Sequence, residues 1–201
     1  MVELGLVDIA VEVSQLSLFL SMPHKGYVVS ALHIMSYLRI NNNSRLVLDP
    51  SYADINISEF KSDENWTAFY GYSEEAKPHN APKPLGKEIE LKMFVNSSYA
   101  GDNTNFCSRT GYMIFMNMSM IDWHTKKQAT AKGAVFGADF VAVKQGVEAL
   151  RVIRYKLRMT GVEISGPTYI YGDNMSVIHN TSKPESLLKK KSNIICYHFV
   201  R

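Results

Sequence analysis

The side chains that could bind a transition metal or act as nucleophiles are widely spaced in this 201-residue chain. Cys107 and Cys196 are the two cysteines, and neither belongs to a C-x-x-C pair. A structural zinc site needs closely spaced thiols or imidazoles, so these cysteines do not predict one. His79, His124 and His198 also lack the spacing of a ligand set. We expect each of them to be a surface or packing histidine.

Two acidic residues stand where a carboxylate could act locally. Asp173 precedes Asn174 just before a predicted helix, and Asp is a good N-cap residue, so capping is one interpretation of Asp173. Asp139 lies near the start of a longer predicted helix. A negative charge there would favour the helix dipole, which is one interpretation of Asp139.

Basic residues are the other chemically suggestive set. They could contact phosphates, which supply most of the non-specific affinity of proteins for nucleic acids. The net charge of +3 permits such a partner without demonstrating it, and a run of charge is also ordinary on a solvated face. The residues are Lys126, Lys127, Arg151, Arg154, Lys156, Arg158 and residues 189–191.

The composition fits one globular core. Hydrophobic residues make up 46% of the chain and charged residues 20%, which suffices for a core and argues against disorder. No segment approaches the roughly 18 consecutive apolar residues of a membrane helix, and the first residues lack the pattern of a secretion signal. We therefore expect no membrane partner and an intracellular location, cytoplasmic or nuclear, rather than secretion.

The amino-terminal part predicts two amphipathic helices. Apolar residues recur with helical spacing over residues 9–20, and Pro23 ends this first pattern. The same spacing recurs over residues 28–38. Residues 46–87 are rich in Pro, Gly and Asn, which predicts a connector with little regular structure. The prediction is therefore three parts, with boundaries at residues 1–45, 46–87 and 88–201.

The third part has the pattern of a sheet with a long helix. Alternation of apolar and polar residues predicts strands, and a helical stripe ending before Gly161 predicts a helix with a left-handed cap. The predicted elements are strands at 89–95, 112–118 and 120–125, a helix at 136–157, a strand at 168–171 and a brief final helix. This order predicts an α/β fold.

Six short blocks resemble the Pol polyprotein of copia-type retrotransposons, from the end of the reverse transcriptase region through the ribonuclease H domain. They occur in the family's order over nearly the whole chain. The blocks are Val7-Asp8-Ile9-Ala10 with Val13-Ser14-Gln15-Leu16-Ser17, Tyr99-Ala100-Gly101-Asp102, Ser108-Arg109-Thr110-Gly111-Tyr112, Trp123-His124-Thr125-Lys126-Lys127-Gln128, Tyr171-Gly172-Asp173-Asn174-Met175-Ser176 and Tyr197-His198-Phe199-Val200-Arg201.

The resemblance implies a fold for each part. Residues 1–45 would be the helical tail of the reverse transcriptase region, and residues 88–201 a truncated ribonuclease H domain. The family's last strand and helix follow the final block, so the expected fold is a ribonuclease H-like mixed sheet with flanking helices. It would lack that last strand and helix and be preceded by two amphipathic helices.

The resemblance also implies a chemistry. Ribonuclease H hydrolyses the RNA strand of an RNA–DNA hybrid with two Mg²⁺ ions held by carboxylates. The family's first Asp falls on Asn96, its Glu on Asp139 and its next Asp on Asp173, while the last Asp lies beyond Arg201. Asn96 lacks the charge that holds metals, and Asp139 is one methylene short, where a displacement of roughly 1 Å can cost about a hundredfold in rate. Asp139 and Asp173 would be the remaining metal ligands.

The resemblance thus predicts a ribonuclease H-like fragment that no longer cleaves, with impaired Mg²⁺ binding. Its expected partners are an RNA–DNA hybrid and the rest of the Pol polyprotein. Two alternatives stay open. One is a non-catalytic nucleic-acid-binding module that uses the basic residues. The other is a nuclease with a rearranged ligand set, for which Asp102 is a further carboxylate.

Overall fold

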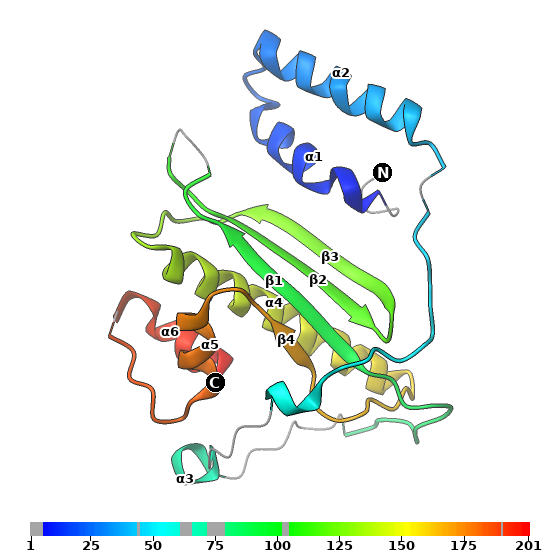
Figure 1. Cartoon of the computed structure of the whole chain (residues 1–201), viewed down its shortest axis with the longest axis vertical. Coiled ribbons are helices and arrows are strands. Elements are labelled where there is room, and N and C mark those ends of the chain that lie inside the picture. Colours follow the sequence, from blue (N-terminus) through cyan, green and yellow to red (C-terminus); the bar gives the residue numbers. More distant parts are fainter. Residues whose placement is uncertain (1–5, 44, 61–65, 72–78, 102–104, 190) are drawn as a thin grey trace.

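The computed structural model describes the chain except for residues 1–5, 44, 61–65, 72–78, 102–104 and 190. Its centre is a four-stranded mixed sheet with a long helix across one face (Figure 1). The first amino-terminal helix lies beside the sheet and the second lies beyond it, while the shorter carboxyl-terminal helices lie near the other edge of the sheet.

The sheet combines an antiparallel meander with one parallel strand. β1 (Leu91–Ser98), β2 (Arg109–Met116) and β3 (Ser119–Lys127) pair antiparallel in sequence order. β4 (Tyr169–Tyr171) pairs parallel with β1, which gives the order β3-β2-β1-β4. A parallel neighbour requires a crossover, and α4 (Val135–Met159) supplies it. The predicted α/β mixed sheet with flanking helices is confirmed, and it is compatible with a ribonuclease H-like fold.

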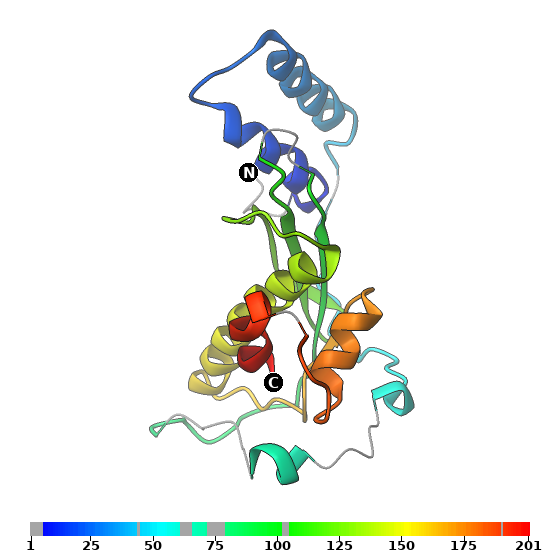
Figure 2. The same ribbon diagram turned by 90° about the vertical axis from the view of Figure 1, so that its left-hand side faces the viewer.

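The sheet face under α4, here called the closed face, holds the core (Figure 2). Met93 of β1 and Ile114 of β2 are fully buried there against Phe140 of α4. β1 approaches α4 closely at Gly146, where a Cβ atom would lie 2.7 Å from the Sδ atom of Met93. The apolar stripe that predicted this helix is therefore the stripe that packs on the sheet.

The end of α4 confirms the predicted left-handed cap. Gly161 has φ +75°, a conformation that suits glycine because it has no Cβ atom. The amide of Val162 donates to the carbonyl of Leu157 at 3.0 Å, and that of Gly161 donates to the carbonyl of Arg158 at 3.0 Å. These two bonds form a Schellman motif, which satisfies carbonyls that the helix end leaves open.

The chain after β4 contains one helix more than the sequence predicted. α5 (Met175–Ser182) is the expected brief helix, and η5 (Lys191–Asn193) leads into the unexpected α6 (Ile194–Val200). Tyr197 of α6 is buried in the core cluster. The apolar pattern of α6 covers seven residues, which is too short for periodicity to distinguish a helix from other buried segments.

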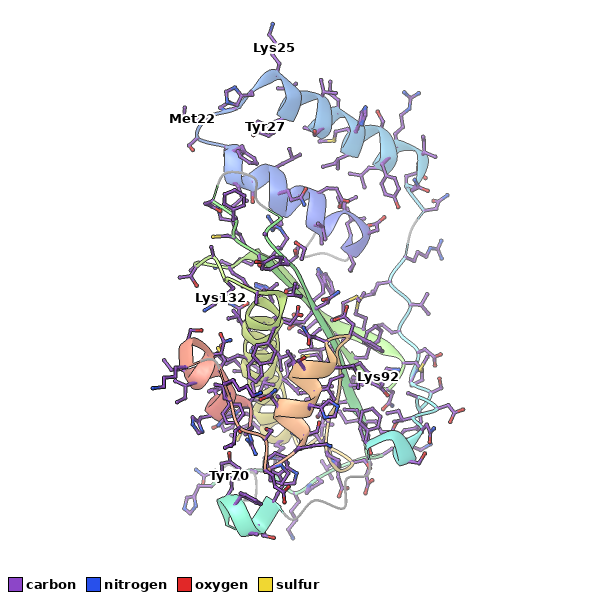
Figure 3. The ribbon with its side chains drawn as sticks, turned by 60° about the vertical axis from the view of Figure 1, so that its left-hand side comes forward. Met22, Lys25, Tyr27, Tyr70, Lys92 and Lys132 are labelled. Atoms are coloured by element: carbon purple, nitrogen blue, oxygen red, sulfur yellow. The ribbon has the colours of Figure 1, made fainter. Side chains whose placement is uncertain are left out.

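The two predicted amino-terminal helices are present, and they differ in packing. The first is η2 (Val7–Ile9), α1 (Ala10–Leu16) and η3 (Ser17–Phe19), and the second is α2 (Lys25–Ile40). α1 packs on β3, where the hydroxyl of its Ser14 donates to the carbonyl of Thr125 at 3.1 Å. α2 buries none of its residues. Phe19 stacks on Tyr27 and joins the two helices (Figure 3).

The connector also contacts the sheet. The amide of Met118, in the β2–β3 turn, donates to the carbonyl of Ser51, and the side chain of Asn117 donates to the carbonyl of Pro50. Two short helices, η4 (Ile57–Phe60) and α3 (Trp66–Tyr70), lie in this segment. These helices were not expected from its Pro-rich and Gly-rich composition. The three-part division of the chain stays a prediction.

Candidate functional site

The three residues aligned with the family's carboxylates lie around one cavity. Asn96 on β1, Asp139 on α4 and Asp173 just after β4 all line a cavity of about 760 Å³. The fold explains the arrangement, because β1 and β4 are parallel neighbours and α4 crosses between β3 and β4. The three aligned positions therefore come together at one cavity. Their role in catalysis is a separate question.

Asp139 is the buried member of the group, with 5% of its surface exposed. The hydroxyl of Ser97 donates to its Oδ1 at 2.5 Å, and the amide of Asn174 donates to its Oδ2 at 2.7 Å. A buried carboxylate is costly unless its oxygens accept hydrogen bonds. Here two side chains satisfy both oxygens, and the carboxylate links α4 to β1 and to the start of α5.

The cap of α5 is Asn174 and not Asp173, so the capping interpretation of Asp173 is wrong. The Oδ1 atom of Asn174 accepts from the amides of Ser176 at 3.0 Å and Val177 at 3.3 Å. Asn174 therefore has two tasks, since its oxygen caps the helix while its nitrogen holds Asp139. The helix-dipole interpretation of Asp139 is also wrong, because that residue lies beyond the first turn of α4.

Asn96 and Asp173 are exposed, and they form the polar rim of the cavity. The Oδ1 atom of Asn96 accepts from the backbone amide of Ser97 at 2.6 Å. The structure therefore separates the predicted site into a buried, fully bonded carboxylate and an exposed pair. Sequence reasoning missed Ser97 and Asn174 as partners of Asp139, although both are polar residues next to the aligned positions.

The residues in place do not fit a two-metal centre. A two-metal centre needs several carboxylate oxygens that converge on the ions. Asp139 is buried and each of its oxygens already accepts one hydrogen bond, while Asn96 is uncharged and its oxygen faces a backbone amide. Among the residues that the structure describes, no three His, Cys, Asp or Glu side chains are close enough to hold a metal ion. Asp102, the predicted substitute carboxylate, lies outside the described residues.

A second cavity of about 540 Å³ lies on the opposite face of the sheet, here called the open face. Phe94, Met113, Trp123 and Tyr171 line it from the four strands, and α1 borders it through Val11 and its neighbours. Asn96 and Asp173 line this cavity too, so the two cavities share a polar rim. We call this second cavity the open-face groove.

A cluster of titratable residues lies at the β2–β3 pairing. Burial raises the pKa of Tyr112 to about 12, and the nearby charge of Asp122 acts in the same direction. Burial also raises the pKa of Asp122 and lowers that of His124. The rings of Tyr112 and His124 stack at 5.2 Å. His124 was predicted to be a surface or packing histidine, and it is a packing one.

The basic residues do not act as one set. Arg154 donates to the hydroxyl of Thr168 at 2.8 Å and so ties α4 to the segment before β4. Lys144 and Arg151 lie over the ring of Phe199, at 5.0 and 5.4 Å from its centroid. Much of the charge on α4 thus serves to hold neighbouring segments, and the predicted phosphate-contacting face stays untested.

The chain is similar to two curated transposon proteins of Arabidopsis thaliana. It is 26% identical over 159 residues, 76% of its length, to the retrovirus-related Pol polyprotein from transposon RE2. It is 22% identical over 194 residues, 96% of its length, to the one from transposon RE1. These similarities support a fragment of a retrotransposon Pol polyprotein. The chain spans 11% of the length of each of these relatives, and no family model matches it.

The predicted resemblance to a retrotransposon Pol polyprotein is therefore confirmed, while the copia type and the ribonuclease H region stay predictions. One further observation bears on the expected partners. In the described part of the chain, no helix is both long and apolar enough to cross a bilayer.

Proposed function

We propose that this Pol fragment carries a ribonuclease H-like domain of the copia type that has lost two-metal hydrolysis of RNA–DNA hybrids. The observation that supports this best is the state of Asp139. It lies on α4 at the position where the family carries a metal ligand, yet its two oxygens accept hydrogen bonds from Ser97 and Asn174. An internal hydrogen-bond network has taken the place of a metal-binding carboxylate.

Two further features support the loss of activity. Asn96 brings no negative charge to the rim, so Asp173 is the carboxylate there that remains exposed. A single exposed carboxylate holds Mg²⁺ weakly, because this ion keeps most of its water unless several oxygen ligands replace it. Mg²⁺ would thus be the ancestral cofactor and the RNA–DNA hybrid the ancestral substrate.

The direct test incubates residues 1–201 with an RNA–DNA hybrid in Mg²⁺ or Mn²⁺ and resolves the RNA strand on a denaturing gel. We expect no metal-dependent cleavage. Cleavage that disappears in Asp173→Asn would overturn the proposal and favour a nuclease with a rearranged ligand set. A metal titration followed by calorimetry adds a second readout. In it, Asn96→Asp should bind Mn²⁺ more tightly than the unchanged chain, because it places a second carboxylate at the rim.

A second candidate is a nucleic-acid-binding module without cleavage. The open-face groove favours it, because aromatic side chains on a sheet face are a common way to bind unpaired bases. The two candidates are compatible, since loss of hydrolysis does not remove a binding surface. A hybrid that is bound and not cut would support both.

A further inference from the structure

The open-face groove is an aromatic surface that crosses the whole sheet. Phe94 of β1 stacks on Tyr171 of β4, with 4.9 Å between centroids and 16° between ring planes. Phe115 of β2, which does not line the groove, meets Phe94 edge-on at 5.7 Å. Within the groove, Met113 of β2 lies between Phe94 and Trp123 of β3. These rings come from alternate strand positions and face away from α4. The surface is therefore a product of the sheet register and not of one sequence motif.

The floor of this groove is bare backbone at Gly111. A Cβ atom added there would meet the backbone oxygens of Asn96 and His124 at 3.9 Å, which is ordinary contact. A side chain would therefore fit without strain, yet none is present. The space that it would occupy lies between Asn96 and Thr125 on the neighbouring strands. A flat group can therefore lie on the sheet backbone there, next to the row of Phe94, Met113 and Trp123.

Cations stand at both ends of the aromatic surface. Lys92 lies at one end of the strands, with its Nζ atom 5.4 Å from the ring centroid of Phe115 (Figure 3). Arg109 lies at the other end, where it donates to Ser14 of α1. Between them, Asn96, Thr125 and Asp173 add hydrogen-bonding groups to the groove. Flat apolar area with polar groups between two cations matches a base attached to a phosphodiester backbone.

We infer that the open-face groove binds a base of a single-stranded nucleic acid. In a duplex the faces of each base are stacked on its neighbours and only its edges are accessible. A groove that binds the faces of bases therefore selects unpaired strands. Base–aromatic stacking contributes enough per base to fix such a strand. A peptide strand is the weaker alternative, because it would add to a sheet edge through backbone hydrogen bonds, and this groove lies on a face. The inference rests on the second candidate function and deepens it by naming the ligand of the open-face groove, and it does not depend on cleavage.

The site can be located with the fluorescence of Trp123. The chain has two tryptophans, so the Trp66→Phe variant of the full chain leaves Trp123 as the single reporter. We expect an eight-nucleotide deoxythymidine strand to quench this fluorescence, and a blunt DNA duplex of equal length to leave it unchanged. Binding should also depend weakly on salt. Two cations that contact the phosphates of the strand correspond to a plot of log K against log salt with a slope no steeper than about −1.4.

The affinity test uses two matched glycine variants and a labelled strand followed by anisotropy. Gly111→Val fills the floor of the groove and should weaken binding at least about tenfold, the scale of one lost stack. Gly133→Val adds the same side chain at an exposed glycine with open space around it and should leave binding unchanged. Trp123→Ala should weaken binding by a similar factor, with circular dichroism checking that each variant is folded.

Three results would overturn the inference. The first is absence of quenching by the single strand. The second is equal affinity of folded Gly111→Val and Gly133→Val, and the third is duplex binding as tight as single-strand binding with a steep salt slope. The last would place nucleic-acid binding on the basic residues of α4 instead. None of these results depends on hybrid cleavage, so the proposed function and this inference can fail separately.

Discussion

The two faces of the same sheet have opposite characters. On the closed face, Met93, Ile114 and Phe140 are fully buried, and the carboxylate of Asp139 has a hydrogen-bond donor at each oxygen. On the open face, Phe94 and Met113 keep 39% and 40% of their surface exposed. Successive side chains of one strand therefore differ in role. Those on the closed face stabilise the fold, and those on the open face are accessible to a ligand.

Under the proposed function, this difference explains how a polyprotein fragment would lose hydrolysis and keep its fold. The closed face carries the packing energy, and Asp139 now contributes to it through Ser97 and Asn174. The open face carries less of that energy, because its apolar side chains stay partly in contact with water. Changes on the two faces should therefore separate stability from binding, and the predictions below test that separation.

The largest effect is expected from neighbouring residues of β2 that point to opposite faces. Ile114→Ala should lower the free energy of unfolding by about 2–5 kcal/mol, because it leaves a cavity in a fully buried position. Met113→Ala removes a side chain of similar size from the open face, where 40% of it is exposed, and should cost less, about 1–2 kcal/mol. Urea unfolding followed by circular dichroism measures both. Equal losses would show that the open face is covered in solution.

Much of this closed face could be predicted from the sequence. The apolar stripe of α4 and the alternation of β1 are local patterns, because each buried face requires apolar residues at the period of its helix or strand. The docking of α1 on β3 could not be predicted, because the hydrogen bond from Ser14 to Thr125 joins residues 111 positions apart. The apolar spacing of α2 also predicted a helix, yet α2 buries none of its residues. Periodicity predicts a helix without specifying what packs against it.

The next effect concerns the two aspartates of the candidate site. Asp139→Ala should cost about 1–3 kcal/mol, because the partly buried donors of Ser97 and Asn174 lose their acceptor. Asp173→Ala changes an exposed rim residue and should stay within about 0.5 kcal/mol. The unfolding free energy of the unchanged chain should not increase with millimolar Mg²⁺. Strong stabilisation by Mg²⁺ that is lost in Asp139→Ala would contradict the proposed hydrogen-bond network.

The site shows where sequence comparison ends. Matching motifs identified Asn96, Asp139 and Asp173, and the fold brings them to one cavity. The comparison could not show what each oxygen accepts, since Ser97 and Asn174 reach Asp139 from 42 and 35 positions away in the chain. It also could not predict the open-face groove, because Phe94, Gly111 and Tyr171 meet through strand register, and Gly111 matters through the side chain that it lacks.

A smaller effect should appear at high pH. Burial raises the pKa of Tyr112 to about 12, while an unfolded tyrosine titrates near pH 10. The unfolded chain therefore loses this proton first, so the stabilisation is fully present below pH 10 and is lost as the pH rises to about 12. Tyr112→Phe should show a smaller fall in unfolding temperature over this range. Tyr155→Phe, an exposed tyrosine of α4, is the control and should fall as the unchanged chain does.

The smallest effect is expected at Gly111, on the floor of the open-face groove. Valine fits a pleated strand better than glycine, and the added Cβ atom meets no atom closer than 3.9 Å. Gly111→Val should therefore leave the free energy of unfolding unchanged or raise it by up to about 1 kcal/mol. Urea unfolding of this variant beside Gly133→Val measures the difference. A loss of more than about 2 kcal/mol would mean that the floor of the groove is packed, and the open face would then belong to the core as the closed face does.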